Sequence, residues 1–285
     1  MESVSYNVGD LNLAGLYWKS ESGNKTPIIA LHGWLDNAAS FLSVAPLLKP
    51  HSVLALDQMG HGLSCHYQPG AAYHFIDGVT HIIVLLRQLG FEKVILLGHS
   101  MGGGISTLIA AAAPDLVEAV ISVDVFGPLV SEPSNALEDL RMSVEQFVAS
   151  QNKKSPFYDS VDSALALRNK IGNNQDETLR DIVERGLEKT PQGYVWRTDP
   201  RLRVHSAIRL TEKQVQTQLK GVQCPVLYIE ADNGFKHAKQ HYLKRKACLE
   251  KVEKFEVEGG HHVHIEKPQV CVDAIFSFLN KHGVN

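Results

Sequence analysis

The sequence GHSMG at residues 98–102 decides the fold of this chain. It directly follows the apolar run KVILL (93–97) and directly precedes an Ala-rich stretch, so Ser100 lies where a strand turns sharply into a helix. Glycines two positions before and after the serine let strand and helix approach without Cβ clashes. The free N–H groups of the helix N-terminus suit an oxyanion that forms beside the serine. The pattern predicts a nucleophile at Ser100; the alternative is a glycine-rich turn without a chemical role.

Two distant segments offer the partners that acyl transfer needs. The sequence LHGW (31–34) follows a strand-like run, and the backbone N–H of Trp34 is expected to pair with that of Met101 as the two oxyanion donors. Near the C-terminus another strand-like run leads into GGHHVHIEKP (259–268). A histidine in a loop after a last strand can act as the general base for a distant serine.

With these motifs the chain resembles a serine hydrolase of the α/β-hydrolase fold. HGWLDNAASF and the HHVH..P ending are most similar to the branch called serine hydrolase-like proteins, near small carboxylesterases. In the family pattern the base is followed five residues on by an acid and seven on by proline, which selects His261 over His262 and His264. The shared motifs, in family order and spacing, are LHGWLDN (31–37), LDQMGHGLS (56–64), GHSMGG (98–103) and GGHHVHIEKP (259–268).

The acidic member of the triad departs from the common family pattern. After the strand near 225–229, many relatives have a glycine followed three residues later by the catalytic aspartate, where this chain has Ala231 and Gly234. Two carboxylates can replace it: Asp232 in the same loop, and Asp124 at the end of an earlier strand. Asp124 is preferred, because several branches of the fold carry the acid there and the role needs only a carboxylate that reaches the histidine Nδ1–H. A plain strand-capping role for Asp124 stays open.

The remaining histidines are expected to be structural. A loop HHxH lacks carboxylate or cysteine partners at ligand spacing, so no metal site is predicted, and His262 and His264 are expected to pack or to form hydrogen bonds. His99 is expected to pack beneath the nucleophile, and His61 to support its loop. The mechanism requires neither a metal nor an organic cofactor.

The order of patterns along the chain predicts the architecture. Residues 4–18 alternate around a Gly-Asp turn and predict an antiparallel hairpin, after which strand-like and helix-period segments alternate. The fold class is therefore α/β: a mostly parallel eight-stranded sheet with helices on both faces. Residues 1–127 and 213–285 are expected to form the core. Residues 128–212, which show no convincing strand, are expected to form a helical cap inserted after strand six, with Tyr194 and Trp196 as weak candidates for substrate contact.

Composition limits the classes of partner. At 285 residues with 44% hydrophobic residues, the chain can bury the core of one such domain. A net charge of −3 gives no electrostatic basis for binding nucleic acid or an anionic membrane. The four scattered cysteines, without a C-x-x-C, predict reduced thiols of a cytoplasmic protein. No signal peptide and no membrane insertion are predicted, because the first residues and the apolar runs match neither pattern.

The resemblance implies hydrolysis of a small-molecule carboxylic ester with a small to medium acyl chain, in two steps of acyl transfer. Ser100 would attack, His261 would act as the base oriented by Asp124, and the amides of Trp34 and Met101 would hold the oxyanion. A thioesterase, a C–C hydrolase or an acyltransferase with the same triad is the alternative. A non-catalytic ligand-binding member of the fold is a further alternative, favoured only by the missing acid after the later strand. The oligomeric state is not indicated.

Overall fold

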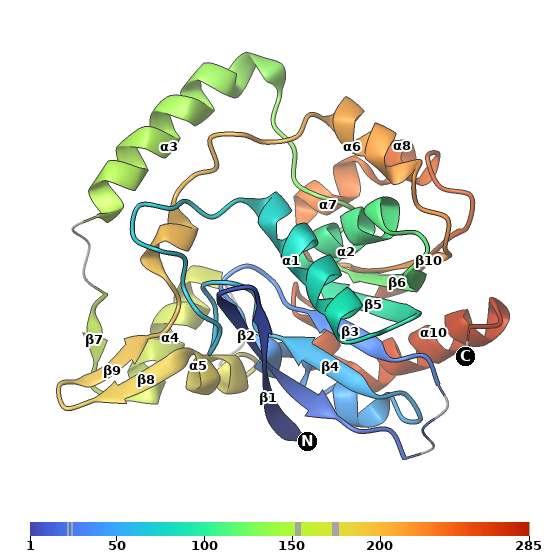
Figure 1. Cartoon of the computed structure of the whole chain (residues 1–285), viewed down its shortest axis with the longest axis horizontal. Helices are drawn as coiled ribbons and strands as arrows, with labels where there is room; N and C mark the ends of the chain where they lie inside the picture. The colour runs from blue at the N-terminus through green and yellow to red at the C-terminus, as the bar shows by residue number, and fades with distance from the viewer. Residues whose placement is uncertain (22, 24, 152–154, 173–176, 285) are drawn as a thin grey trace.

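A single mixed sheet forms the centre of the computed structural model, which describes residues 1–21, 23, 25–151, 155–172 and 177–284. Its strands are β1 (Glu2–Val8), β2 (Leu11–Trp18), β3 (Ile28–Leu31), β4 (Val53–Leu56), β5 (Val94–His99), β6 (Val117–Val123), β10 (Val226–Ala231) and β11 (Val252–Val257). The order across the sheet is β1-β2-β4-β3-β5-β6-β10-β11 (Figure 1). The pairs β1–β2 and β2–β4 are antiparallel and the others are parallel. The predicted eight-stranded, mostly parallel sheet is therefore confirmed.

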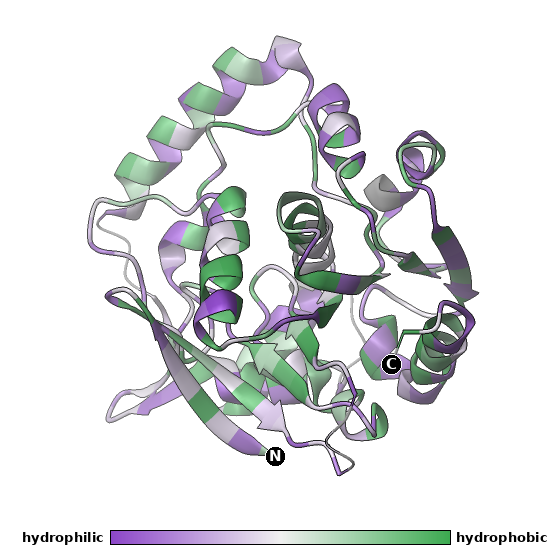
Figure 2. Cartoon of the chain, turned by 45° about the vertical axis from the view of Figure 1, so that its right-hand side comes forward, coloured by the Kyte–Doolittle hydropathy of each residue, from purple (hydrophilic) through white to green (hydrophobic). Residues whose placement is uncertain are grey.

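Helices cover both faces of this sheet. Successive residues of a strand face opposite sides, so in β3 Ile29 and Leu31 belong to one hydrophobic core while Ile28 and Ala30 belong to the other. Figure 2 shows the hydrophobic residues gathered in the central strands and the helices beside them. The first core is closed by α1 (Phe75–Gln88), α2 (Met101–Ala112), α6 (Glu212–Leu219) and α8 (Tyr242–Lys246). The second is closed by η1 (Ala38–Phe41), η2 (Ala45–Leu47), α9 (Val263–Glu266) and α10 (Pro268–Lys281).

The expected N-terminal hairpin is present. Strands β1 and β2 pair from Glu2 opposite Tyr17 to Val8 opposite Leu11. Gly9 takes a φ of 60°, which glycine adopts without the Cβ penalty of other residues. Within the described residues, no helix is long and apolar enough to cross a membrane.

Residues 128–212, called the insertion below, lie between β6 and α6, and the chain re-enters the sheet at β10 (Figure 1). The insertion differs from the wholly helical cap that the sequence predicted, because its described part also contains a three-stranded sheet in the order β7-β9-β8. These strands have only two to four residues, too short for a clear alternation of hydrophobic and polar positions. Its elements are η3 (Pro133–Asn135), α3 (Ala136–Ser150), β7 (Phe157–Tyr158), α4 (Val161–Gly172), α5 (Arg180–Gly186), β8 (Leu187–Thr190), β9 (Gly193–Trp196) and η4 (Pro200–Arg203).

Buried polar contacts attach the insertion to the core. Asp57, which follows β4 and is fully buried, accepts from Arg185 of α5 at two oxygens, with distances of 3.2 and 2.7 Å. The same carboxylate accepts the backbone N–H groups of Ala38 and Leu63 at 2.7 and 2.9 Å. A buried charge is tolerated when it is paired and fully hydrogen-bonded in this way. The Asp57–Arg185 pair therefore holds α5 against the core.

This buried ion pair predicts that substitution of Asp57 lowers the stability of the protein more than substitution of the exposed Asp162. Asp57→Asn should lower the free energy of unfolding by about 3 kcal/mol, because it leaves the Arg185 guanidinium without its buried counter-charge. Asp162→Asn removes a partner of Arg180 in an exposed pair and should cost less than about 1 kcal/mol. Urea unfolding followed by circular dichroism measures both. Equal losses in the two variants would contradict a buried role for the Asp57–Arg185 pair.

Candidate active site

Ser100 lies at the turn between β5 and α2, the strand–turn–helix context that the motif predicted. Its φ of 50° and ψ of −117° are values that residues with a side chain rarely adopt. The flanking glycines allow this turn. A Cβ on Gly98 would lie 2.3 Å from the carbonyl oxygen of Gly102. A Cβ on Gly102 would lie 1.9 Å from the carbonyl oxygen of Leu31. The two glycines are thus required for the close approach of α2 to β5 and β3.

The same approach brings the two expected oxyanion donors into one region. Met101 is the first residue of α2, so its N–H has no acceptor within the helix. Trp34 lies in the loop after β3, and its backbone N–H donates to no acceptor among the described residues. The Trp34 side chain extends to the insertion, where its indole Nε1–H donates to the carbonyl of Leu202 at 2.9 Å.

A buried histidine holds the Trp34 loop in place. The backbone N–H of Leu35, a residue with φ of 63°, donates to His61 Nε2 at 3.1 Å, while His61 Nδ1 lies 3.0 Å from the carbonyl oxygen of Met59. Burial lowers the pKa of His61 to about 3, so the ring is neutral at pH 7 and can accept at Nε2. His61 therefore supports the loop through a neutral imidazole.

His261 is paired with a carboxylate from another strand. It lies in the loop between β11 and α9, and its Nδ1 is 2.6 Å from Oδ2 of Asp124. Asp124 follows β6, is fully buried and has a φ of 51°. Its carboxylate also accepts the backbone N–H groups of Ala231 at 3.2 Å and Phe235 at 2.6 Å. These donors fix the carboxylate in the direction of His261.

Gly234 explains how a carboxylate from β6 fits there. A Cβ at Gly234 would lie 2.2 Å from each carboxylate oxygen of Asp124, so any side chain at 234 would collide with it. Asp232, the alternative acid, instead accepts the backbone N–H of Gly259 at 2.8 Å and is exposed. The structure therefore brings Asp124, and not Asp232, to His261.

His99, the residue before Ser100, connects the β5–α2 turn with the His261 loop. His99 Nε2 lies 2.9 Å from the carbonyl oxygen of His261, and the two rings are 4.7 Å apart. The Ser100 hydroxyl makes no hydrogen bond to another described residue. Such a contact often tightens only when substrate binds, so this geometry is compatible with a Ser100–His261 pair.

The two other histidines of the loop are buried, as expected for structural residues, but one of them has an unexpected partner. His262 Nε2 lies 3.1 Å from Oδ2 of Asp36, and His264 Nε2 lies 2.8 Å from the Ser40 hydroxyl. Asp36 was not singled out from the sequence, although it lies in the LHGWLDN motif. The carboxylate that the HHxH loop lacks at ligand spacing thus comes from a segment more than two hundred residues away.

An apolar cavity of about 340 Å³ is separated from the His261–Asp124 pair by Phe235, and none of Ser100, His261 and Asp124 is among its lining residues. Phe235, in its wall, contacts the His261 ring at 5.7 Å between centroids, and Val125 directly follows Asp124. Arg245 also lines the cavity, but its guanidinium is neutralised by Glu212 and donates to a backbone carbonyl. The other lining residues are Gly127, Pro128, Leu129, Val130, Arg209 and His241.

The aromatic residues expected as weak candidates for substrate contact lie elsewhere. Tyr194 and Trp196 are in β9 and pack against the hydrophobic cluster inside the insertion. Trp196 lies against Gly186, where a Cβ would be 3.2 Å from the indole, and its ring is 6.1 Å from that of Tyr158. Their surroundings are those of packing residues.

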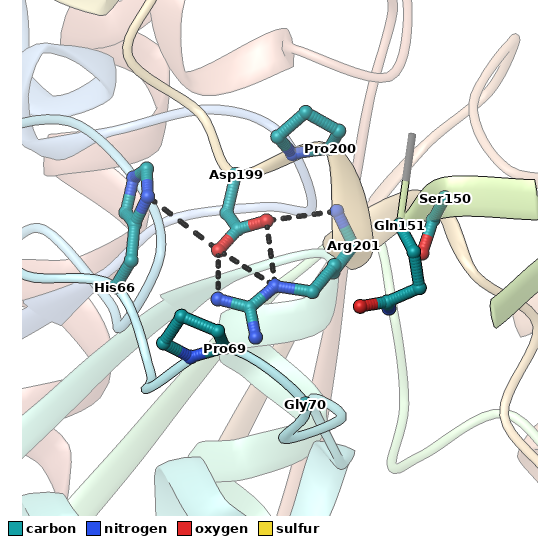
Figure 3. Close-up of a pocket in the computed structure, with 8 residues that line it drawn as sticks. All are labelled: His66, Pro69, Gly70, Ser150, Gln151, Asp199, Pro200 and Arg201. Atoms are coloured by element: carbon teal, nitrogen blue, oxygen red, sulfur yellow. Dashed lines mark hydrogen bonds and ion pairs between the residues drawn. The ribbon is translucent and has the colours of Figure 1, made fainter. Parts of the chain in front are cut away.

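A second hollow, drawn in Figure 3, lies between the loop around His66 and η4. Its wall contains the ion pair of Arg201 and Asp199, with a 2.7 Å contact. Every N–H of the Arg201 guanidinium is already used, by Asp199 and by the carbonyls of Tyr67, Gln68 and Ala71. Arg201 has no donor left for a ligand, so this hollow does not extend the site.

Comparison with known proteins agrees with this geometry. A family model described as the alpha/beta hydrolase fold matches residues 26–268. The chain belongs to the α/β-hydrolase family. A "Probable serine hydrolase" of Drosophila melanogaster is 34% identical, with 93% of this chain and 83% of the relative covered. "Serine hydrolase-like protein 2" of Homo sapiens is 31% identical, with 94% and 90% covered.

Solved structures show the same fold. The crystal structure of a hypothetical protein from Pseudomonas aeruginosa PAO1 superposes with a TM-score of 0.90 at 33% identity, covering 98% of this chain and 100% of that one. The chain is thus a serine hydrolase of the α/β-hydrolase family, in the serine hydrolase-like branch that the motifs indicated.

The buried histidines of the site predict how stability depends on pH. Burial lowers the pKa of His61 to about 3 and that of His99 to about 4, whereas both titrate near 6.5 in the unfolded chain. Below about pH 6.5 the unfolded chain therefore binds protons that the folded chain does not. The unfolding midpoint should stay level above pH 7 and fall as the pH is lowered from 6.5 to 4.

Thermal unfolding between pH 4.5 and 8 measures this slope. His61→Asn should make this slope shallower, because it removes one of the two buried groups. A midpoint that stays constant from pH 7.5 to 5 would contradict the prediction.

Proposed function

We propose that this serine hydrolase cleaves carboxylic esters through an acyl-enzyme intermediate, with Ser100, His261 and Asp124 as its triad. The observation that carries the proposal is the 2.6 Å contact between His261 Nδ1 and Asp124, beside a strained serine at a helix N-terminus. The non-catalytic alternative was favoured only by the missing acid after the later strand, and the contact of Asp124 with His261 supports the catalytic proposal instead.

The proposed chemistry follows from this arrangement. The Ser100 oxygen attacks the ester carbonyl while His261 Nε2 takes the hydroxyl proton, and Asp124 keeps the proton of the imidazole on Nδ1. The amides of Trp34 and Met101 stabilise the tetrahedral oxyanion. The C–O bond then breaks, and His261 gives its proton to the leaving alcohol. Water, deprotonated by His261, attacks the acyl-enzyme, and Ser100 leaves with the proton as the carboxylic acid is released.

The cavity lined by Phe235 supports a neutral substrate of small to medium size. Its volume of about 340 Å³ is at the lower end of small-molecule sites. Most of its wall is apolar, and its buried cation, Arg245, is neutralised by Glu212. An "sn-1-specific diacylglycerol lipase" of Danio rerio, 26% identical over 263 residues, acts on a carboxylic ester, which favours an ester over a thioester for this chain.

We also propose a cytoplasmic location. The four cysteines are free thiols in the structure, and two of them, Cys224 and Cys271, have their pKa raised by burial. Unpaired and unreactive thiols are typical of proteins in a reducing compartment.

The nucleophile and the base are tested by alanine variants. Ser100→Ala and His261→Ala should each lower kcat for p-nitrophenyl esters by roughly three or more orders of magnitude, because each removes a group that forms or breaks bonds. Ser134→Ala and His282→Ala, which change neither the proposed triad and oxyanion donors nor a residue that lines the cavity, are the matched controls and should keep normal kcat. Labelling with a fluorophosphonate should be lost in Ser100→Ala. Rapid ester turnover by either site variant would disprove the proposed triad.

The acid is tested by moving it between strands. Asp124→Asn should lower kcat by about 10⁴-fold, because the amide favours the wrong tautomer of His261. Gly234→Ala should also lower kcat, because its Cβ would displace the Asp124 carboxylate. In the double variant Asp124→Gly, Gly234→Asp, the carboxylate enters the same space from β10, so activity should recover relative to Asp124→Gly alone. Asp232→Asn is the control; a large loss of kcat in it, with a small loss in Asp124→Asn, would transfer the role to Asp232.

A further inference from the structure

One buried carboxylate contacts several parts of the site. Asp36 lies two residues after Trp34 and is 2% exposed. Its Oδ2 is 3.1 Å from Nε2 of His262 and 3.6 Å from Nδ1 of His99. Its Oδ1 accepts from Nη2 of Arg168, in α4 of the insertion, at 2.6 Å. Asp36 thus joins three segments that are distant in sequence.

Two of the Asp36 partners, His99 and His262, are sequence neighbours of the proposed nucleophile and the proposed base. His99 directly precedes Ser100 and is hydrogen-bonded to the carbonyl oxygen of His261. His262 directly follows His261. A shift of the Asp36 carboxylate would therefore act on the residue before the nucleophile and on the residue after the base.

The charges of this cluster are consistent with a fixed hydrogen-bonded arrangement. Burial lowers the pKa of His99 to about 4, so at pH 7 the ring is neutral and its Nε2–H donates to the His261 carbonyl. Burial opposes ionisation of Asp36, yet its contact with His262 and the charge of Arg168 hold its pKa well below the usual range. The carboxylate is therefore charged, and Arg168 supplies the compensating positive charge.

The same side chains also satisfy the distance criterion for a cation site. Ligand atoms of Asp36, His99 and His262 lie within 4.8 Å of one another, and two imidazoles with a carboxylate can bind a transition metal. However, the Arg168 guanidinium already occupies the other oxygen of Asp36, and a divalent cation would face this positive charge at close range. The ion pair is therefore favoured over a metal ion.

We propose that Asp36 and Arg168 are positioning residues for the reaction, an inference that rests on the proposed function. Arg168 fixes the carboxylate, and the carboxylate holds the His261 loop through its 3.1 Å contact with His262, whose ring packs against that of His99. Through Arg168, the insertion contributes to catalysis without touching the reacting atoms. A misplacement of about 1 Å in a catalytic constellation can lower the rate by about 10²-fold.

The experiment compares arginine variants by kcat per active site, counted by titration with a fluorophosphonate so that misfolded protein does not contribute. Arg168→Met should lower kcat by about tenfold to 10²-fold, with a smaller change in KM. Arg168→Lys should recover part of the loss, because it restores the charge but not the geometry of the guanidinium. The matched control is Arg180→Met on α5, whose ion pairs are exposed and should not affect kcat.

A double-mutant cycle tests whether Arg168 acts through Asp36. Asp36→Asn should lower kcat per active site as Arg168→Met does, and the double variant should lose little more than either single one. If both single variants lower only the unfolding midpoint and keep wild-type kcat per titrated site, the positioning role is overturned while the proposed function stands. If the wild-type protein neither labels nor turns over esters, the proposed function itself fails.

Metal analysis tests whether Asp36, His99 and His262 bind a cation. Purified wild-type protein dialysed against zinc and then against buffer should hold no stoichiometric metal by mass spectrometry. One zinc per chain that is lost in Asp36→Asn would show that the cluster is a metal site and would overturn the ion-pair proposal.

Discussion

The close approach of α2 to β5 and β3 is the constraint on which the site depends. This approach is possible only because Gly98 and Gly102 have no Cβ. A side chain at either position would clash with the backbone of Gly102 or Leu31. This contact forces Ser100 into its unusual conformation and brings the first N–H of α2 beside the Trp34 loop. The positions of the proposed nucleophile and of the proposed oxyanion donors thus depend on one packing constraint.

The proposed acid illustrates how a parallel sheet allows a function to move between strands. Strands β6 and β10 are parallel neighbours, paired from Val120 with Val226 to Val123 with Ile229, so their carboxyl ends reach the same edge. A carboxylate after either strand can therefore reach His261. In this chain Asp124 fills the space, and Gly234 leaves that space open.

Several buried contacts attach the insertion to the core loops that carry the proposed site. Arg185 pairs with Asp57, Arg168 pairs with Asp36, and the Asn37 amide donates to the Ile182 carbonyl at 2.7 Å. Two of these contacts fall within the segment that follows Trp34. By contrast α3, at the edge of the insertion, has no buried residue, and its hydrophobic and polar positions alternate along its exposed surface (Figure 2). The segment from α4 to α5 of the insertion is thus hydrogen-bonded to the loop that contains Trp34, whereas α3 buries none of its residues.

The sequence alone determined the sheet, the N-terminal hairpin, the elbow, and the choice of Ser100, His261 and Asp124 as candidates. The sheet, the hairpin and the elbow depend on local patterns, which are apolar runs between turns and glycines around a serine. The selection of His261 and the preference for Asp124 rest on the resemblance to the family pattern. The sequence missed the small sheet of the insertion, whose strands are too short to show a period. Tertiary structure alone decided that Asp124 rather than Asp232 meets His261, and that Asp36 joins His99, His262 and Arg168. Those contacts join residues more than sixty positions apart, and no local pattern specifies which distant side chains share a buried space.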